Sequence, residues 1–348
     1  MQRFPRLPRT LAALAAASAL VVSASACGGD DSSGSGTSGG GGGGEPLVIG
    51  YSAWPGWFPL KVAEEKGFFD KAGVKVELRY FNDYTASIDA LTAGQTDANT
   101  QTLNDTLAGE ASGADLKIVV NTDFSAGNDA VIVDKSITSV DQLKGKTIAA
   151  EAGVVDHYLL LQGLEANGMA EDDIEFRGTP TDAAAAGFAA GQFDGVAVFA
   201  PFTVEALKRP GSHVLFSSKD YPGSIPDHIV FDAKTVADRP ADVQKVVDAW
   251  YATVDYLKKN PEEARKIMAD QAGISEQEYA TLDAGTDILD APDALKAFDD
   301  SAAPTSLPRT AAKINPFLVS SGLTQKEAPL DGIFAPEFTK AYVDKAGK

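Results

Sequence analysis

Five acidic residues lie at or near the ends of predicted strands: Asp105, Asp129, Glu151, Asp156 and Asp182. The short loops that carry them contain no lysine and no arginine. Carboxylates in such loops can form charge-assisted hydrogen bonds with an ammonium or guanidinium group, at about 1.5–3 kcal/mol each. These residue types favour a site for a cation, whereas an anion would meet negative charge.

Aromatic side chains accompany the acids. Trp54 and Trp57 lie in the first predicted loop, Phe199 ends a later strand, and Asn104 precedes Asp105. An aromatic face attracts a cation by roughly 0.5–2 kcal/mol, and a guanidinium group fits carboxylates well. We therefore predict a site for a small organic cation, guanidine or a small amine, formed by Trp54, Trp57, Asn104, Asp105, Asp129, Glu151, Asp156 and Phe199.

Several of these residues have a structural alternative. Asp156 and Asp182 lie at predicted helix starts, where an acid caps free backbone N–H groups. Trp57 could instead face the core side of its helix. A second ligand class also stays open, because residues 153–155 could offer open N–H groups to an anion at a helix start.

The chain offers little to a metal or a cofactor. Its three histidines, His157, His213 and His228, lack metal-ligand spacing. It has no Gly-x-Ser-x-Gly elbow and no phosphate-binding glycine loop. The single cysteine, Cys27, precedes the predicted folded part. We expect no cofactor, no metal site and no enzymatic activity, with hydrolysis by paired acids as the alternative.

A sequence repeat predicts the elements that position these residues. Residues 91–98 read Leu-Thr-Ala-Gly-Gln-Thr-Asp-Ala, and residues 188–195 read Phe-Ala-Ala-Gly-Gln-Phe-Asp-Gly. Each copy follows a helical run and leads into a short strand. Two similar α/β units predict two lobes, with a ligand cleft between them at the carboxyl ends of the strands. We assign Asp97 and Asp194, inside the motif, to the turn or strand start.

Strand and helix patterns alternate over 47–121 and over 139–216, which is typical of parallel sheets with crossover helices. We expect the chain to cross between lobes near 128–134 and near 226–232 and to form a hinge there. The sequence thus predicts an α/β, two-lobed fold with two hinge-crossing strands. The lobes are assigned as 46–130 with 231–348 for lobe 1, and 131–230 for lobe 2.

The start of the chain resembles a targeting segment. Arginines precede an apolar run at 11–22, and small residues lead up to Cys27. This order is typical of a signal peptide, and small residues directly before a cysteine resemble a bacterial lipoprotein lipobox. Residues 28–44 are almost wholly Gly, Ser, Thr and Asp. We expect a signal peptide over 1–26, a lipid-bearing Cys27 in a 27–45 tether, and a body anchored to the outer face of the cytoplasmic membrane.

The net charge of −19 bears on the partners. An acidic protein repels nucleic acid, and no apolar run is long enough to remain as a membrane span. We expect a monomeric body without a nucleic-acid partner.

Several further pieces of sequence resemble a known family when they are taken together. They are Gly50-Tyr51 with Trp54-Pro55-Gly56, Ala-Glu-Glu-Lys-Gly-Phe-Phe at 63–69, both Ala-Gly-Gln-x-Asp motifs, Asp-Gln-Leu-Lys-Gly-Lys at 141–146, and Asn-Pro-Glu-Glu-Ala at 260–264. They look like the periplasmic substrate-binding proteins of ABC importers, in the nitrate/sulfonate/taurine-like (NMT1/SsuA/TauA) group. The resemblance covers about residues 46–300. It implies a type II periplasmic-binding-protein fold that delivers a small-molecule solute to an ABC permease and its ATPase.

The same resemblance implies two alternatives to the cation. The first is the ligand usual in that group, a sulfonate, taurine or nitrate. The remote one is an enzyme of the thiamine-pyrimidine-precursor type, whose cysteine-rich iron chemistry has no ligands in a body without cysteine.

Overall fold

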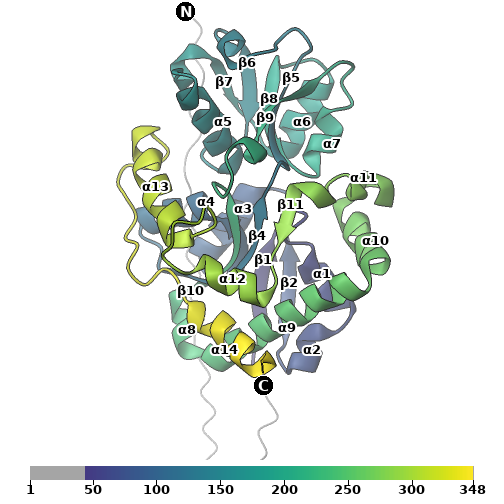
Figure 1. Cartoon of the computed structure of the whole chain (residues 1–348), viewed down its shortest axis with the longest axis vertical. Coiled ribbons are helices and arrows are strands. Elements are labelled where there is room, and N and C mark those ends of the chain that lie inside the picture. Colours follow the sequence, from purple (N-terminus) through teal and green to yellow (C-terminus); the bar gives the residue numbers. More distant parts are fainter. Residues whose placement is uncertain (1–43, 348) are drawn as a thin grey trace, which may run out of the picture. The chain divides into compact units, whose positions relative to one another are not determined.

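The structure is a computed structural model that describes residues 44–347. Within the compact unit Gly42–Lys348, the strands form two separate sheets, one of six strands and one of five. Figure 1 shows the smaller sheet with its teal helices at the top of the view and the larger sheet below it. The α/β, two-lobed fold predicted from the sequence is confirmed.

The two halves of the repeat form matching units of parallel strands. In the larger sheet the order is β2-β1-β3, with β1 at Leu47–Tyr51, β2 at Val76–Tyr80 and β3 at Ala98–Thr102. In the smaller sheet the order is β7-β6-β8, with β6 at Thr147–Ala150, β7 at Glu175–Gly178 and β8 at Gly195–Phe199. The crossover helices are α1 Pro59–Glu65, α2 Phe68–Ala72, α3 Tyr84–Thr92 and α4 Leu103–Ser112, and then α5 Val155–Ala166, α6 Thr181–Ala189 and α7 Phe202–Ala206.

The aspartates of the repeated motif perform the same task in both lobes. Asp97 Oδ2 accepts a hydrogen bond of 2.8 Å from the Val48 N–H at the start of β1. Asp194 Oδ2 accepts one of 3.0 Å from the Thr147 N–H at the start of β6. Both aspartates therefore fasten the turn to the first strand of their unit, as predicted.

The chain passes between the two sheets twice. β4 (Leu116–Ser125) belongs to the larger sheet and β5 (Asp129–Val133) to the smaller one. The return runs from β9 (His213–Ser217) in the smaller sheet to β10 (Pro226–Asp232), which pairs with β3 and β4. Since β10 lies wholly in the larger sheet, the chain returns to that sheet before residue 226. The predicted boundary of lobe 2, at residue 230, lies a few residues later. The division into two moving lobes itself stays a prediction.

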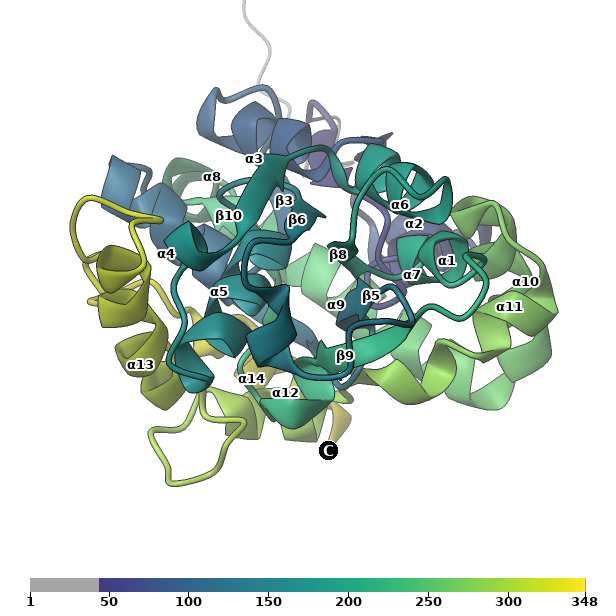
Figure 2. The same ribbon diagram turned by 90° about the horizontal axis from the view of Figure 1, so that it is seen from above.

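The segment after β10 packs mainly on the larger sheet. Its elements are α8 Ala233–Asp238, α9 Pro240–Lys259, α10 Pro261–Ala272, α11 Glu276–Ala280, β11 Thr286–Ile288, α12 Ala291–Ala297, α13 Leu307–Ser320 and α14 Pro336–Ala346. On α9 an apolar stripe that includes Val243, Val247 and the fully buried Trp250 faces the core. In the view from above, Figure 2 shows α9 behind the strands near the middle and α12 beside α14 near the lower edge.

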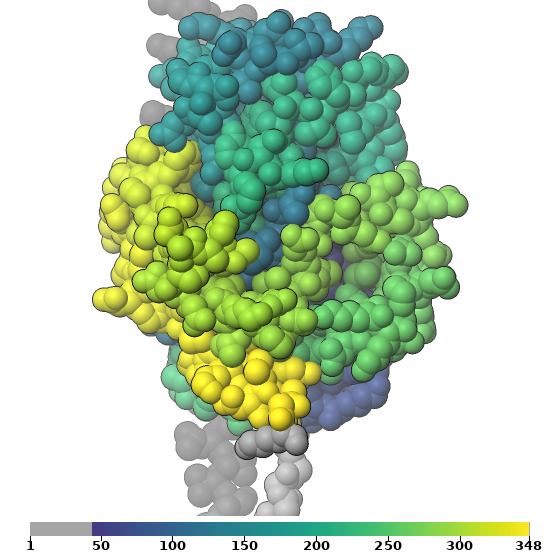
Figure 3. All heavy atoms as spheres, viewed as in Figure 1, coloured from purple at the N-terminus to yellow at the C-terminus, as the bar shows by residue number. Residues whose placement is uncertain are grey.

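Helix α13 also reaches the smaller lobe. The Tyr158 ring of α5 and the Phe317 ring of α13 lie 5.4 Å apart, edge to face. In Figure 3 the yellow C-terminal residues lie against teal residues of the smaller lobe along the left side. The C-terminal segment is therefore a third link between the lobes, beside the two strand crossings.

Some expectations fall outside this description. The signal peptide, Cys27 and nearly all of the tether precede residue 44, so those predictions lie outside the described residues. Among residues 44–347, no helix combines the length and apolarity needed to cross a bilayer.

Candidate functional site

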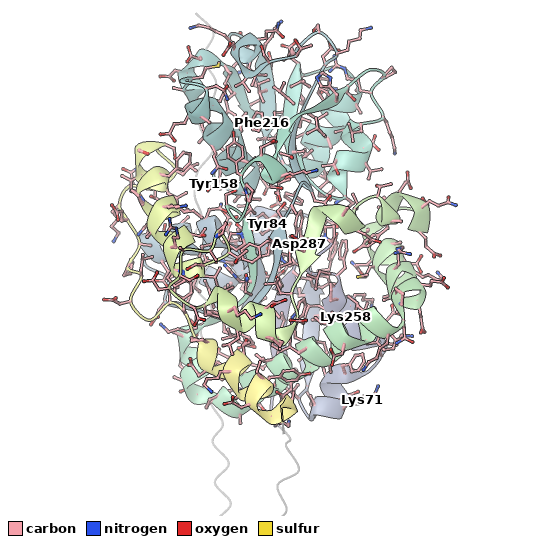
Figure 4. All side chains as sticks on the ribbon, viewed as in Figure 1. Lys71, Tyr84, Tyr158, Phe216, Lys258 and Asp287 are labelled. Atoms are coloured by element: carbon pink, nitrogen blue, oxygen red, sulfur yellow. The ribbon has the colours of Figure 1, made fainter. Side chains whose placement is uncertain are left out.

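Aromatic side chains from both lobes meet between the two sheets. Trp54 and Trp57 follow β1, Tyr84 begins α3 and Phe199 ends β8. The rings of Trp54 and Tyr84 lie 6.4 and 5.9 Å from the Phe199 ring, and the Trp57 ring lies 5.4 Å from that of Tyr84. Figure 4 labels Tyr84 near the middle of the view, between the sheets. Because Phe199 belongs to the smaller sheet, these contacts join the lobes.

The aromatic rings enclose a very small cavity of about 10 Å³. Its lining consists of Trp54, Trp57, Tyr84, Thr102, Asp129, Val155, Phe199 and Asp227. A cavity needs roughly 10–15 Å³ to hold one water molecule. The cavity is therefore almost filled by the side chains around it, and a solute can enter only if the two lobes move apart.

Six carboxylates are buried in or beside the cavity: Asp105, Asp123, Asp129, Glu151, Asp156 and Asp227. Among residues 44–347, no lysine or arginine forms an ion pair with any of them. Asp129 Oδ2, Asp156 Oδ1 and Asp227 Oδ2 have no hydrogen-bond partner within the described part of the chain. Because an unpaired polar atom is costly to bury, these oxygens point to a ligand that would satisfy them.

The pKa values of these groups reflect the crowding. Burial is the main cause that raises the pKa of Asp105, Asp123 and Asp129 to about 7. Burial, reinforced by neighbouring carboxylates, raises the pKa of Asp156 and Asp227 well above the ordinary range. The nearby Trp57 indole lowers the pKa of Asp227 and so opposes these effects. Trp57 Nε1 itself has no partner among the described residues that meets hydrogen-bond geometry. Without a cation, the cluster therefore keeps protons near neutral pH.

Asp123 packs closely against the loop that follows β1. Trp54 Nε1 donates a hydrogen bond of 2.9 Å to Asp123 Oδ1, and Thr122 Oγ1 donates one of 2.9 Å to Oδ2. A Cβ atom at Gly56 would lie 2.0 Å from Asp123 Oδ2. Only glycine at position 56 leaves room for this carboxylate.

Asp105 is held chiefly by its own lobe. Tyr84 and Thr102 donate hydroxyl hydrogen bonds of 2.8 and 2.7 Å to Oδ2, and Asn104 Nδ2 donates one of 2.8 Å to Oδ1. The backbone N–H of Val155, at the start of α5 in the other lobe, also lowers the pKa of Asp105. Asp105 is therefore a link between the lobes and does not line the small cavity.

Glu151 is held by two helices. Oε1 accepts hydrogen bonds from the Thr85 N–H and Oγ1 at 2.9 and 2.5 Å, at the start of α3. Oε2 accepts from Thr181 Oγ1 at 2.8 Å, at the start of α6. The same hydroxyl lies 2.5 Å from Asp156 Oδ2, and no side-chain cap is present at the start of α5. Asp156 is therefore not the N-cap considered above.

The predicted residues gather in one place with two kinds of position. Four of them, Trp54, Trp57, Asp129 and Phe199, line the cavity. The other four lie beside it, and protein hydrogen bonds hold them: Asn104, Asp105, Glu151 and Asp156. A role for any of the eight in ligand binding stays a prediction.

Sequence reasoning missed three acidic or phenolic members of the cluster: Tyr84, Asp123 and Asp227. Asp123 directly precedes Phe124 near the end of β4, and Asp227 lies near the start of β10, two residues before the apolar run that begins at Ile229. An acid at the end of an apolar strand was the signal that found Asp129, and it applies equally to these two. Tyr84 gave no such signal because tyrosine is common at ordinary helix starts.

The histidines add no positive charge to the cluster. Burial lowers the pKa of His228, next to Asp227 on β10, to about 3. Within the described residues, no group of three His, Cys, Asp or Glu side chains converges as a metal site would require. The Gly153 N–H, which was a possible donor to an anion, donates to His157 Nδ1 at 3.2 Å.

A cleft between two α/β lobes joined by two crossings defines the class of periplasmic-binding-protein folds. The alkanesulfonate-binding protein SsuA from Xanthomonas axonopodis pv. citri, solved bound to MOPS, matches with a TM-score of 0.70 at 20% identity, over 83% of this chain and 98% of that chain. At this identity the likeness shows the fold. The family model described as NMT1/THI5 like matches residues 54–264, and the chain belongs to this family.

Three curated relatives match part of the chain in sequence. A protein of Brucella abortus (strain 2308) named as a binding protein is 28% identical over 231 residues, 64% of this chain and 70% of the relative. The taurine-binding periplasmic protein of Escherichia coli (strain K12) is 25% identical over 222 residues, 64% of this chain and 63% of the relative. The 4-amino-5-hydroxymethyl-2-methylpyrimidine phosphate synthase of Uromyces fabae is 29% identical over 105 residues, 30% of this chain and 28% of the relative.

Proposed function

We propose that the protein is the solute-binding component of an ABC importer and that it captures a small organic cation, such as guanidine or a small amine, between its lobes. One observation carries the choice of a cation. Six carboxylates are buried in or beside the cavity, and no basic side chain among the described residues pairs with them.

The geometry provides the contacts such a cation needs. Asp129 and Asp227 line the cavity, and each has one carboxylate oxygen without a partner among the described residues, which could accept an N–H donor of the solute. Trp54 and Trp57 also line the cavity, and an aromatic ring attracts positive charge. Closing the lobes removes water and strengthens each charge contact. A permease would then recognise the closed form.

An anionic ligand is the second candidate, and the names of the relatives favour it. The taurine-binding and alkanesulfonate-binding proteins belong to the same group as this chain. Taurine also carries an ammonium group, which a carboxylate such as Asp129 could accept. The buried carboxylates argue against the sulfonate end, because negative charge would have to enter a cavity that two acids, Asp129 and Asp227, already line.

An enzymatic role is a more remote candidate. Its support is the pyrimidine phosphate synthase, which matches only 30% of this chain. The body after residue 27 contains no cysteine for the iron chemistry of that class. We propose binding without turnover, and prolonged incubation with any bound solute checks for a product.

The cellular setting follows from the first residues of the chain. We propose that residues 1–26 are a signal peptide, that Cys27 carries the lipid, and that residues 27–45 tether a monomeric body to the outer face of the cytoplasmic membrane. The envelope location agrees with the periplasmic name of the taurine-binding relative. Labelling with a radioactive fatty acid that is lost in Cys27→Ala tests the anchor.

Calorimetric titration tests the choice of ligand. The body from Glu45 onward is titrated with guanidinium, methylammonium, taurine and nitrate, each in two buffers that differ in ionisation enthalpy. A cation should bind and release protons, because it displaces the protons held by acids with pKa values of about 7. Tight binding of taurine or nitrate, without proton release and with no heat from the cations, would establish the anion instead.

A further inference from the structure

Glu151 bridges the starts of two helices that belong to different lobes. Its Oε1 accepts from the N–H and hydroxyl of Thr85, in the first turn of α3 on the larger lobe. Its Oε2 accepts from the hydroxyl of Thr181, in the first turn of α6 on its own smaller lobe. The side chain is only 5% exposed, so the bridge is shielded from water.

Asp105 makes the reciprocal link. It belongs to the larger lobe and lines one pocket together with Gly153 and Val154, which directly precede α5 on the smaller lobe. The Val155 N–H at the start of α5 also lowers the pKa of Asp105. Asp105 thus lies near a helix start of the other lobe, as Glu151 does. Both side chains are buried.

The start of a helix attracts anions because its first N–H groups are free and its dipole is positive there. A sulfonate or nitrate would seek these positions in a cleft of this fold. In this chain the positions at α3, α5 and α6 already carry carboxylates that are covalently part of the protein. An external anion would have to displace them.

We propose that Glu151 and Asp105 form an inter-lobe latch that closes the cleft and, by occupying the helix starts, makes the site reject anions. Glu151 is the specificity-determining member, since its contact crosses the cleft through both a backbone and a side-chain donor. The part of this proposal that concerns closure of the cleft is independent of the proposed function, whereas the rejection of anions rests on it.

Asp156 completes the network behind Glu151. The Thr181 hydroxyl has one hydrogen, yet its oxygen lies 2.8 Å from Glu151 Oε2 and 2.5 Å from Asp156 Oδ2. A protonated Asp156 can donate to Thr181, which then donates to Glu151. The strongly raised pKa of Asp156, caused first by burial, agrees with this order.

Two substitutions separate closure from selectivity. Glu151→Gln removes the charge and keeps the shape of the side chain, so both closure and rejection of anions should weaken. Thr85→Val removes only the hydroxyl contact across the cleft, so closure should weaken while the Glu151 charge still rejects anions. Asp182→Asn is the matched control, because Asp182 is an exposed acid in the first turn of α6, next to the Glu151 partner Thr181.

Small-angle scattering of the ligand-free compact unit, residues 42–348, measures closure. Glu151→Gln and Thr85→Val should each give a larger radius of gyration than the wild type and Asp182→Asn. Calorimetry with taurine measures selectivity, and Glu151→Gln should gain affinity by at least about tenfold, which corresponds to ~1.4 kcal/mol. Thermal unfolding confirms that each variant is folded.

The outcomes decide each half separately. Unchanged radii of gyration in both variants would overturn the latch. Equal taurine affinity in the wild type and Glu151→Gln would overturn the rejection of anions. Guanidinium binding by the wild type is measured in its own titration, so the proposed ligand can fail while the latch stands, and the latch can fail while the cation still binds.

Discussion

At the scale of single residues, the site is a set of acids that the protein itself leaves without a counter-charge. Asp129 and Asp227 both line the cavity, and each has one oxygen without a hydrogen-bond partner among the described residues. A chain selected for stability alone would replace such groups, since each unpaired buried acid costs free energy of folding. Their presence is understandable if a bound cation supplies the missing partner.

Asp129→Asn and Asp227→Asn should each weaken guanidinium binding by about 10–100-fold, because each removes a charge-assisted hydrogen bond of about 1.5–3 kcal/mol. The ligand-free variants should also unfold at higher temperature than the wild type, since one buried acid is neutralised. Calorimetry and thermal unfolding measure the two effects. Asp172 is an exposed acid on the smaller lobe, so Asp172→Asn should change neither the guanidinium affinity nor the unfolding temperature. Undiminished affinity in both cavity variants would remove these residues from the site.

The raised pKa values also predict how stability depends on pH. Asp105, Asp123 and Asp129 have pKa values of about 7 in the folded chain, against ~3.9 when unfolded. Between these values the folded protein holds more protons than the unfolded chain, so the free energy of unfolding should fall as pH rises from about 4 to 7. His228, with a folded pKa of about 3, acts in the opposite direction below ~6.5 but is outnumbered.

Urea unfolding of the ligand-free body at pH 5 and pH 8 checks this dependence. The midpoint should be lower at pH 8, and Asp123→Asn should reduce the difference between the two midpoints. Saturating guanidinium should restore stability mainly at pH 8, where the acids are charged. A midpoint that rises with pH would show that these acids are ionised throughout.

At the scale of elements, the sequence predicted most of what carries the site. The repeated motif correctly indicated two β–α–β–α–β units, since Asp97 and Asp194 fasten both in the same way. The acidic loops lie close together in the structure, because parallel strands bring their carboxyl ends together. The sequence could not show which acids face the cavity. The direction of each side chain at a strand end decides this, and the side chain of Glu151 lies between the starts of two helices.

The smaller lobe depends on a close helix–strand contact at Gly163. A Cβ atom at this position of α5 would lie 2.1 Å from Phe216 Cζ on β9. Gly163→Ala should therefore lower the free energy of unfolding by about 1–3 kcal/mol through overpacking. Combining it with Phe216→Leu, which makes room, should give less destabilisation than the sum of the two single changes. Additive effects would show that the two residues do not press on each other.

At the scale of the whole body, two sheets, two crossings and helix α13 define how the lobes can meet. The contacts of Phe199 with Trp54 and Tyr84 and the bridge from Glu151 to Thr85 all describe a closed arrangement. The cavity behind these contacts measures only about 10 Å³, so binding of a solute requires the lobes to part first. The same contacts would reform around the solute and present the closed form to a permease.

The most direct measurement is a crystal structure of the body grown with equimolar guanidinium and taurine. The account predicts a planar cation in the cavity, within hydrogen-bond distance of Asp129 Oδ2 and Asp227 Oδ2 and against the Trp54 or Trp57 ring. A sulfonate at that place, with Glu151 displaced from the start of α3, would contradict both the choice of ligand and the rejection of anions.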